Sequence, residues 1–264
     1  MEKKDLPIAV VDSGVGGISV LSELVKALPH EDFLYFGDSA NAPYGTKTRA
    51  EVLEITRSNL QMLIQRGIKA FVLACNTATS AAARTLREEY PQLPIIGVEP
   101  AVKPAALLCE NPTVLVMATA LTLREEKFNS LVDRFAHRAR VLPLPCTGLV
   151  EMIEAGTLEG KPLDDYLGAL FAPHKKEKID AVVLGCTHYP HVRGAIAAHF
   201  PLGTPILDGG EGTARQTKKR LAELSLLCER ERVGRVEFLN SLGDESMLSL
   251  SRFLLERALE NNQR

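Results

Sequence analysis

The stretch AFVLACNTAT, residues 70–79, decides the fold class. It begins with small and apolar residues that predict a buried strand, and after Cys75 an Ala-rich helix is predicted from Asn76 to about Tyr90. An apolar strand without polar alternation is typical of a parallel sheet that helices cover on both faces. The stretch therefore predicts an α/β protein.

The same alternation of short apolar runs and amphipathic stretches continues along the chain. Further strands are predicted at residues 8–11, 33–36, 95–98, 114–117, 141–144, 181–184, 205–207 and 233–239. Further helices are predicted at residues 17–28, 48–66, 122–135, 150–155, 190–199, 212–228 and 245–259. This strand–helix order predicts mostly parallel sheets.

A second stretch, AVVLGCTHYP at residues 181–190, repeats the pattern of the first. Each has an apolar strand, a small residue, a cysteine and then polar residues, and Cys186 stands 111 residues after Cys75. Residues 10–13 and 117–120 match loosely at a similar offset. We infer two α/β halves related by duplication. Ligands bind beyond the carboxyl ends of parallel strands, so halves that face each other there would hold one thiol on each side of a shared cleft.

The composition is that of an ordinary globular protein. The 264 residues are 45% hydrophobic and 24% charged, with a formal net charge of −2. No long basic run indicates phosphate binding, so nucleic acid is not an expected partner. No apolar run approaches the length of a membrane span, and no apolar signal region precedes the first strand. Five cysteines without a Cys-x-x-Cys pair predict reduced thiols in the cytoplasm rather than a disulfide framework.

The five cysteines divide into two groups. Cys109, Cys146 and Cys228 are predicted to be small buried hydrophobic residues. Cys75 and Cys186 instead follow apolar strands, at the sheet edge where sites lie. Each also precedes a predicted helix N-terminus, which favours the thiolate. The same setting occurs twice, and this predicts a pair of reactive thiols.

Two acid/base groups on opposite faces of one carbon atom can invert its configuration. One thiolate removes a proton while the other thiol delivers one, and an ordinary thiol pKa of about 8.5 can be tuned toward working pH. Asp12 follows the first strand at the sheet edge of Cys75, and His188 stands two residues after Cys186, so both are candidates to set protonation states. Taken alone, Asp12 could equally be a helix N-cap and His188 a packed surface residue.

Five motifs in a fixed order carry a resemblance to a known family. They are VDSGVGG at 11–17, YFGD at 35–38, APYG at 42–45, ACNTAT at 74–79 and LGCTHYP at 184–190. With them the sequence resembles, over most of its length, the glutamate racemases of the cofactor-independent aspartate/glutamate racemase superfamily. The resemblance implies interconversion of L- and D-glutamate by a two-base mechanism, with no cofactor and no metal. It also implies a supply of D-glutamate for peptidoglycan, and so a role in cell-wall biogenesis and cell shape.

The resemblance further implies roles for individual residues. Cys75 and Cys186 are the two catalytic acid/bases, with Asp12 assisting the first and His188 the second. An acidic residue after the segment that contains Cys146 completes the catalytic set, and Glu154 fits that place better than Glu151. The implied substrate-binding residues are Asp12, Ser13, Pro43, Tyr44, Gly45, Asn76, Thr77, Thr119, Thr187 and His188.

For the fold, the resemblance implies two similar three-layer α/β domains with mostly parallel sheets. They are related by a pseudo-twofold axis, with the active site in the cleft between them. Residues 1–98 and 208–264 are expected to form the first, discontinuous domain, and residues 99–207 the second. Glutamate is the expected small-molecule partner, and a cytoplasmic homodimer is the expected assembly.

Three other functions fit parts of the sequence. Gly14-x-Gly16-Gly17 after a strand suggests nucleotide binding, but position 19 is Ser where the dinucleotide motif has Gly. Cys186-x-His188-x-x-His191 suggests a metal-dependent hydrolase, but it lacks a second group of ligands at zinc spacing. A non-catalytic binding protein for acidic amino acids would use the same polar groups, yet it offers no reason for two thiols.

Overall fold

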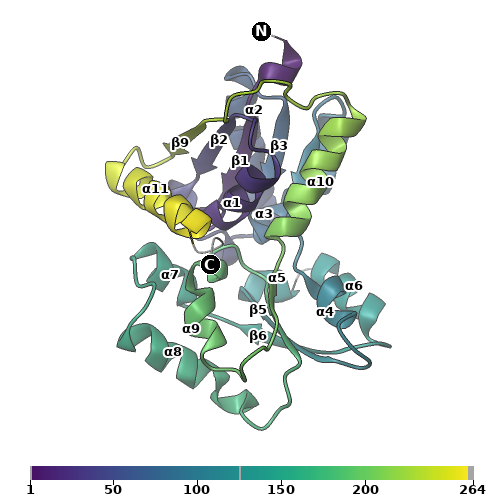
Figure 1. The fold of residues 1–264 in the computed structure, drawn as a ribbon, viewed down its shortest axis with the longest axis vertical. Helices are drawn as coiled ribbons and strands as arrows, with labels where there is room; N and C mark the ends of the chain where they lie inside the picture. Colours follow the sequence, from purple (N-terminus) through teal and green to yellow (C-terminus); the bar gives the residue numbers. More distant parts are fainter. Residues whose placement is uncertain (1, 125, 261–264) are drawn as a thin grey trace. The chain divides into compact units, whose positions relative to one another are not determined.

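The first sheet is assembled from strands near both ends of the chain. It contains β1 (Ile8–Asp12), β2 (Phe33–Gly37), β3 (Ala70–Leu73), β4 (Ile95–Gly97) and β9 (Val236–Asn240). Their order is β4-β3-β1-β2-β9, and every pairing is parallel (Figure 1). The three central strands are buried along their whole length, which explains why their sequences are apolar on both faces.

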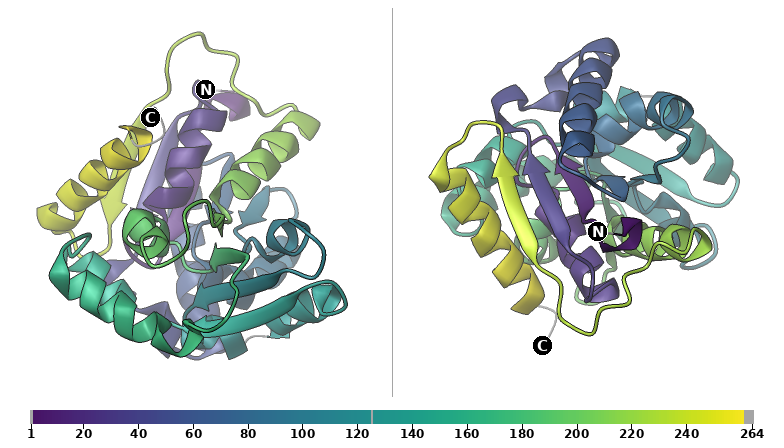
Figure 2. Two further views of the ribbon diagram at one scale, coloured as in Figure 1. Left: turned by 60° about the horizontal axis from the view of Figure 1, so that its bottom comes forward. Right: turned by 90° about the horizontal axis from the view of Figure 1, so that it is seen from above.

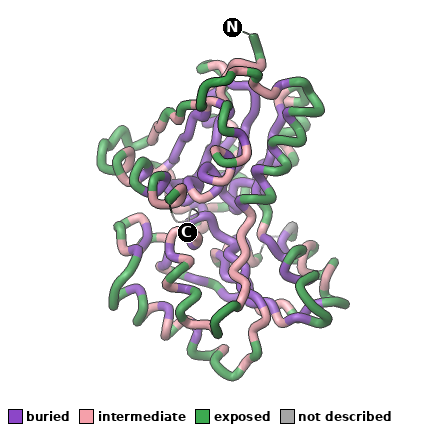
Figure 3. Tube along the Cα trace, viewed as in Figure 1, coloured by how far each residue is buried: buried purple, intermediate pink, exposed green. Residues whose placement is uncertain are grey.

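Helices cover both faces of this sheet (Figures 1 and 2). On one face, α2 (Arg49–Gln65) and α3 (Asn76–Glu89) pack together. On the other, α1 (Ile18–Ala27) packs against α10 (Gly210–Glu223) and α11 (Glu245–Glu260). Alternate strand residues join the core beneath α2 and α3, and the buried trace follows the strands while the outer helix turns are exposed (Figure 3).

The second sheet has four strands, again all parallel. It contains β5 (Thr113–Ala118), β6 (Arg140–Pro145), β7 (Ala181–Leu184) and β8 (Ile206–Asp208) in the order β6-β5-β7-β8. The helices described with it are α4 (Val102–Ala106), α5 (Ala120–Arg124), α6 (Glu126–Phe135), α7 (Leu149–Glu154), α8 (Lys161–Phe171) and α9 (Arg193–Ala197). α4 and α6 pack together over one face of this sheet. Short 3₁₀ turns are η1 (Lys3–Asp5), η2 (Ser39–Asn41), η3 (Tyr44–Thr46), η4 (Ala172–His174) and η5 (Tyr189–Val192).

The computed structural model describes residues 2–124 and 126–260. Their contacts divide them into two units. Unit 1 holds the first sheet and comprises the described residues up to Glu99 and from Gly210 onward, whereas unit 2 holds the second sheet and comprises Pro100–Gly209. The predicted α/β fold with parallel sheets is confirmed. No helix within the described ranges is both long and apolar enough to cross a membrane.

The structure corrects several predicted helices. The predicted helix 122–135 is two helices, α5 and α6, and residue 125 between them lies outside the described residues. The predicted helix 190–199 is the 3₁₀ turn η5 followed by the short α9. The predicted helix 212–228 ends at Glu223, because Ser225 adopts a left-handed conformation with φ of 54°.

The two sheets are built alike where the cysteines leave them. The Ala74 N–H donates to the Val11 carbonyl at 2.8 Å, and the Gly185 N–H donates to the Met117 carbonyl at 2.7 Å. β3 therefore lies beside β1 as β7 lies beside β5. When the two sheets are compared in this register, Asp12 is equivalent to Ala118 and Ser13 is equivalent to Thr119. The looser match expected from the sequence alone is thus shifted by one residue.

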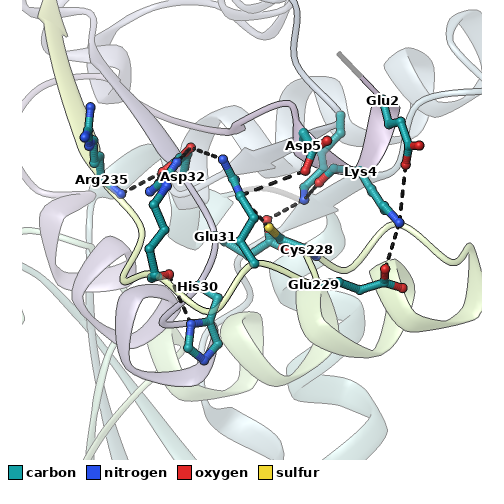
Figure 4. Close-up of polar contacts among 12 residues, drawn as sticks. Glu2, Lys4, Asp5, His30, Glu31, Asp32, Cys228, Glu229 and Arg235 are labelled. Carbon is teal, nitrogen blue, oxygen red and sulfur yellow. Dashed lines mark hydrogen bonds and ion pairs between the residues drawn. The ribbon is translucent and has the colours of Figure 1, made fainter.

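The amino-terminal edge of the first sheet carries an ionic cluster (Figure 4). The buried Glu31 carboxylate pairs with the buried Lys69 ammonium and accepts a hydrogen bond from the Cys228 N–H at 2.8 Å. Asp32 accepts one from the Arg235 N–H, also at 2.8 Å. These bonds fix the segment that leads into β9 at the edge opposite to the one from which Cys75 emerges.

Candidate active site

Most of the residues predicted for the first half of the site lie at the carboxyl edge of the first sheet. Asp12 ends β1, the loop after β2 carries Tyr44, and Cys75 follows β3. Because the three strands are parallel neighbours, their carboxyl ends meet at this edge. The predicted residues found here are Asp12, Ser13, Pro43, Tyr44, Gly45, Cys75, Asn76 and Thr77.

Cys75 is the N-cap residue of α3. Its Sγ accepts a hydrogen bond from the Ala78 N–H at 3.5 Å and lies 3.8 Å from the Ser13 Oγ. The side chain is buried, with 6% of the residue exposed. A helix N-terminus presents unpaired N–H groups and a positive dipole end, so this position favours the thiolate.

Asp12 is held at the carboxyl end of β1 by a tightly packed glycine turn. Its Oδ1 accepts a hydrogen bond from the Gly14 N–H at 3.0 Å, and the Tyr35 hydroxyl donates to the Gly14 carbonyl at 2.8 Å. A Cβ atom on Gly17 would lie 2.6 Å from the Asp12 Cβ and 2.9 Å from the Ala74 Cβ. Close packing against Asp12 and Ala74 therefore explains why position 17 is a glycine, without any need for nucleotide binding.

The loop after β2 contributes a buried tyrosine. The Tyr44 hydroxyl donates a hydrogen bond to Asp38 Oδ2 at 2.6 Å. Burial, and then this hydrogen bond, raises the pKa of Tyr44 far above its usual value, so the phenol stays protonated. Neither Asp38 nor Asn59, which also donates to Asp38, was predicted as a site residue. The signals were present: Asp38 directly follows a strand, and Asn59 is a polar residue on the apolar face of its helix.

Asn76 and Thr77 are the first residues of α3, and both are buried. The Asn76 side-chain Oδ1 is shielded from solvent and accepts no hydrogen bond from the described residues. A buried carbonyl oxygen without a donor is costly, so this atom is suited to accept a hydrogen bond from a bound molecule.

The residues predicted for the second half of the site include a chain of three side chains in unit 2. The Cys186 Sγ lies 3.8 Å from His188 Nδ1, and His188 Nε2 lies 2.9 Å from Glu154 Oε1. Cys186 and His188 are buried, whereas Glu154 is partly exposed. With its Nε2 proton donated to Glu154, the imidazole presents Nδ1 as an acceptor for the thiol proton. Contrary to prediction, Cys186 is followed by a turn and η5 rather than by a long helix.

Helix α7 brings Glu154, and not Glu151, to His188. Glu154 is its last residue, while Glu151 lies in the first turn and is exposed. The loop before α7 is tied by the Tyr166 hydroxyl, which donates to the Thr147 carbonyl at 3.0 Å. α7 starts after Gly148, whose φ of 92° requires a residue without a side chain.

The other cysteines differ from the two at the strand ends. Burial raises the pKa of Cys146 to about 12, so this thiol stays protonated and suits the predicted hydrophobic role. Cys228 is only partly buried and its Sγ accepts from Arg230 Nε at 2.8 Å, and Cys109 is exposed, so the prediction that these two are buried hydrophobic residues is wrong. Cys109 follows the short helix α4 on a surface turn, a placement that cysteine composition cannot reveal.

Two predicted threonines also lie at the carboxyl edge of the second sheet. Thr187 is buried directly after Cys186. Thr119 follows β5, and its Oγ1 lies 2.9 Å from the Thr122 Oγ1 and accepts from the Thr122 N–H at 3.2 Å. Thr119 therefore caps the first turn of α5 as well as bordering the edge.

The two edges thus offer two protonatable thiols with different support. Cys75 has a helix N-terminus and the Ser13 hydroxyl, whereas Cys186 has an imidazole–carboxylate pair. Each thiol can release a proton to its surroundings and take one from a C–H bond. Among residues 2–124 and 126–260, no three His, Cys, Asp or Glu side chains form a group that could hold a metal ion.

Comparison with known proteins adds sequence and structural relatives. The sequence model of the Asp/Glu/Hydantoin racemase family matches residues 8–217. The glutamate racemase of Clostridium perfringens is 47% identical over 253 residues, covering 96% of this chain and 97% of that protein. The crystal structure of Francisella tularensis glutamate racemase with D-glutamate superposes with a TM-score of 0.82 at 30% identity, covering 96% of this chain and 94% of the other. The Escherichia coli glutamate racemase with L-glutamate and the activator UDP-MurNAc-ala gives a TM-score of 0.83 at 30% identity, covering 94% and 95%.

Proposed function

This chain belongs to the Asp/Glu/hydantoin racemase family and is an amino-acid racemase, and we propose that it interconverts L-glutamate and D-glutamate without a cofactor. The observation that carries the proposal is the repeated placement of a cysteine as the second residue after a strand that pairs with the first strand of its sheet. Relatives named glutamate racemases support glutamate as the substrate.

Cys186 is proposed to exchange a proton with the α-carbon through His188. The imidazole takes the thiol proton at Nδ1, and Glu154 stabilises the resulting imidazolium through its Nε2–H. The thiolate sulfur then removes the α-proton, and the electron pair of the C–H bond stays on the α-carbon and its carboxylate. When the reaction runs the other way, the same thiol returns a proton.

Cys75 is proposed to act on the opposite face of the α-carbon. The Ala78 N–H donates to its sulfur and favours the thiolate. Asp12, at the end of β1, is the carboxylate that lies at the same edge of the sheet. One thiolate accepts the α-proton and the other thiol donates a new one, so the configuration inverts and no electron acceptor is needed. We assign Cys75 to one enantiomer and Cys186 to the other.

The proposed substrate contacts are polar groups at the two edges. In unit 1, Asn76 Oδ1 is proposed to accept from the substrate ammonium, because it lacks a donor among the described residues. The hydroxyls and backbone N–H groups suited to the two carboxylates belong to Ser13, Tyr44, Gly45, Thr77, Thr119 and Thr187, and Pro43 shapes the loop that presents them. Fixed donors of this kind stabilise the carbanion-like state more than they stabilise the substrate.

The proposed physiological role is the supply of D-glutamate for peptidoglycan, in the cytoplasm and as a homodimer. A reducing compartment suits the mechanism, since both thiols must remain unoxidised. Size-exclusion chromatography with light scattering tests the homodimer, and a monomer at micromolar concentration contradicts it.

The test of the function is racemisation in D₂O, followed by proton NMR and chiral chromatography. Each glutamate enantiomer should give the opposite enantiomer with deuterium at the α-carbon, because the product proton comes from a solvent-exchanged thiol. Product that keeps the α-proton of the substrate excludes the two-base mechanism. Glutamate binding without turnover indicates a binding protein, and turnover of aspartate alone refutes the proposed substrate.

Two variants test the assignment of the thiols. Cys75→Ala and Cys186→Ala should each abolish racemisation, whereas Cys109→Ala, at an exposed position, should leave it unchanged. Full activity in either of the first two variants contradicts the proposal.

A further inference from the structure

The loop of residues 38–47 carries Pro43, Tyr44 and Gly45, yet its backbone is tied mainly to itself. The Asn41 N–H donates to the Asp38 carbonyl at 3.1 Å, and the Lys47 N–H donates to the Tyr44 carbonyl at 3.2 Å. These are local turns within η2 and η3 and not ladders to a strand. The start of the loop is also held from outside, because the Asp38 N–H donates to the Asp12 carbonyl and the Ala40 N–H donates to the Ser241 Oγ, both at 2.9 Å. The turns do not fix where residues 41–47 lie, so side chains must do so.

A buried cluster of three side chains provides that anchor, and the partly buried Asn41 adds to it by donating from Nδ2 to both Asp38 carboxylate oxygens at 3.0 and 3.1 Å. Asp38 is 1% exposed, and its Oδ2 accepts from the Tyr44 hydroxyl at 2.6 Å and from the Asn59 Nδ2 at 3.0 Å. The same Asn59 amide lies 3.3 Å from the Tyr44 hydroxyl oxygen and donates to it. Each member therefore contacts the other two. Asn59 belongs to the middle of the long helix α2, so the cluster joins the loop to a rigid element.

The cluster also restricts what Tyr44 can do. Its single phenolic proton is donated to Asp38, and one lone pair of its oxygen accepts from Asn59. The raised pKa of Tyr44 keeps that proton in place at neutral pH. Tyr44 is therefore suited to hold its neighbours in place rather than to exchange protons with a substrate.

We propose that Asn59 and Asp38 are positioning residues, which hold Tyr44 and with it the substrate-binding backbone of residues 43–45. The inference rests on the proposed function for the role of the loop in binding glutamate. Removing the Asn59 amide takes from the Tyr44 hydroxyl oxygen the donor described for it, and takes one of three donors from Asp38, which keeps Tyr44 and Asn41. The loop then loses its side-chain tie to α2 and can leave its position.

The test is Asn59→Ala, compared with Thr56→Val as a matched control. Thr56 is a buried polar residue of the same helix, and its hydroxyl donates to the Val52 carbonyl of that helix instead of to the loop. In Asn59→Ala, KM should rise about tenfold for both enantiomers, while kcat changes less than about threefold. Thr56→Val should leave KM unchanged, even where it lowers the unfolding temperature.

A double-mutant cycle separates this anchor from general destabilisation. Tyr44→Phe removes the donor to Asp38, and if both side chains act through one cluster, the double variant should raise KM little more than the worse single variant. Fully multiplicative effects refute the shared cluster. Tyr44→Phe also serves where Asn59→Ala does not fold, and an unchanged KM in it overturns the proposal.

Hydrogen exchange gives a readout that does not depend on turnover. Amides of residues 39–47 should exchange faster in Asn59→Ala than in the wild type and in Thr56→Val, with little change in α3. Equal exchange in all three proteins refutes the anchoring role. A wild type that does not racemise glutamate refutes the proposed function instead, and the exchange experiment still decides whether Asn59 holds the loop.

Discussion

The substitution Glu154→Gln isolates the charge in the chain from Cys186 to His188 to Glu154. Glutamine keeps a carbonyl oxygen that can accept from His188 Nε2, at the place where Glu154 Oε1 now lies 2.9 Å away. The negative charge that stabilises the imidazolium is lost. A hydrogen bond to a charged group contributes about 1.5–3 kcal/mol, and a neutral one about 0.5–1.5 kcal/mol. The difference of about 1–2 kcal/mol predicts a fall in kcat/KM of about 5- to 30-fold.

Thermodynamics adds an internal check on that measurement. L- and D-glutamate have equal free energies in water, so the equilibrium constant is one and kcat/KM is the same in both directions. Polarimetry started from each enantiomer should therefore report the same fall. A fall that differs between directions shows an assay error and not an effect of the residue.

The deuterium isotope effect then locates the affected step. If Glu154 acts through Cys186, proton transfer at Cys186 becomes the slowest step in both directions. With α-deuterated glutamate, the isotope effect should rise for the enantiomer that Cys186 deprotonates, because C–D cleavage is then the slow step. It should fall for the other enantiomer, for which C–D cleavage at Cys75 precedes the slow step.

The matched control is Glu151→Gln, on the same short helix but exposed to solvent. It removes the same charge without touching His188, so kcat/KM should change less than about twofold. The reasoning is refuted if Glu151→Gln matches Glu154→Gln, or if the two isotope effects move in the same direction.

Two further predictions concern stability. Gly17→Ala should lower the free energy of unfolding by about 1–3 kcal/mol and reduce activity, because the added Cβ would lie 2.6 Å from the Asp12 Cβ. The control is Gly212→Ala in α10, where the added Cβ meets open space, and it should be neutral or stabilising by up to about 1 kcal/mol. Urea titrations measure both. The hydrogen bond from Arg232 is the main cause that lowers the pKa of Asp32 to about 2, from an ordinary value of 3.8. The ionised Asp32 carboxylate therefore stabilises the folded state fully above about pH 4, and this contribution disappears as the pH falls through about 2. After allowance for solvent screening, Asp32→Asn should cost about 1 kcal/mol at pH 7, and its unfolding midpoint should converge with that of the wild type near pH 2; a constant gap across this range contradicts the ionic origin.

The strand pattern could be predicted well because buried parallel strands need apolar residues on both faces. The stretch that ends at Cys75 and the one that ends at Cys186 both read as strands for this reason, and both are strands. Helix α8 was not predicted, although Leu163, Leu167 and Phe171 recur at helical spacing and are its buried residues. Short helices such as α4 and α9 have too few turns to show a period.

The site could be predicted only where residues stand next to a strand end. His188 is two residues from Cys186, so sequence alone places it near the thiol. Glu154 could be chosen over Glu151 only from the resemblance, because its distance to His188 depends on how the loop at 146–148 turns. Asn59 shows the limit most clearly. It reaches Tyr44 across the gap between a helix and a loop, and no local spacing encodes that contact.

The interrupted path of unit 1 governs how the protein can fold during synthesis. Residues Pro100–Gly209 emerge from the ribosome as one continuous segment, so unit 2 can complete itself while translation continues. Unit 1 must wait several seconds longer, because α10, α11 and the edge strand β9 come last. Until then the apolar side of α1 has no cover, and a nascent chain stalled near Gly209 would present it to chaperones and proteases. A ribosome pause placed just after that point would therefore lower the yield of folded protein.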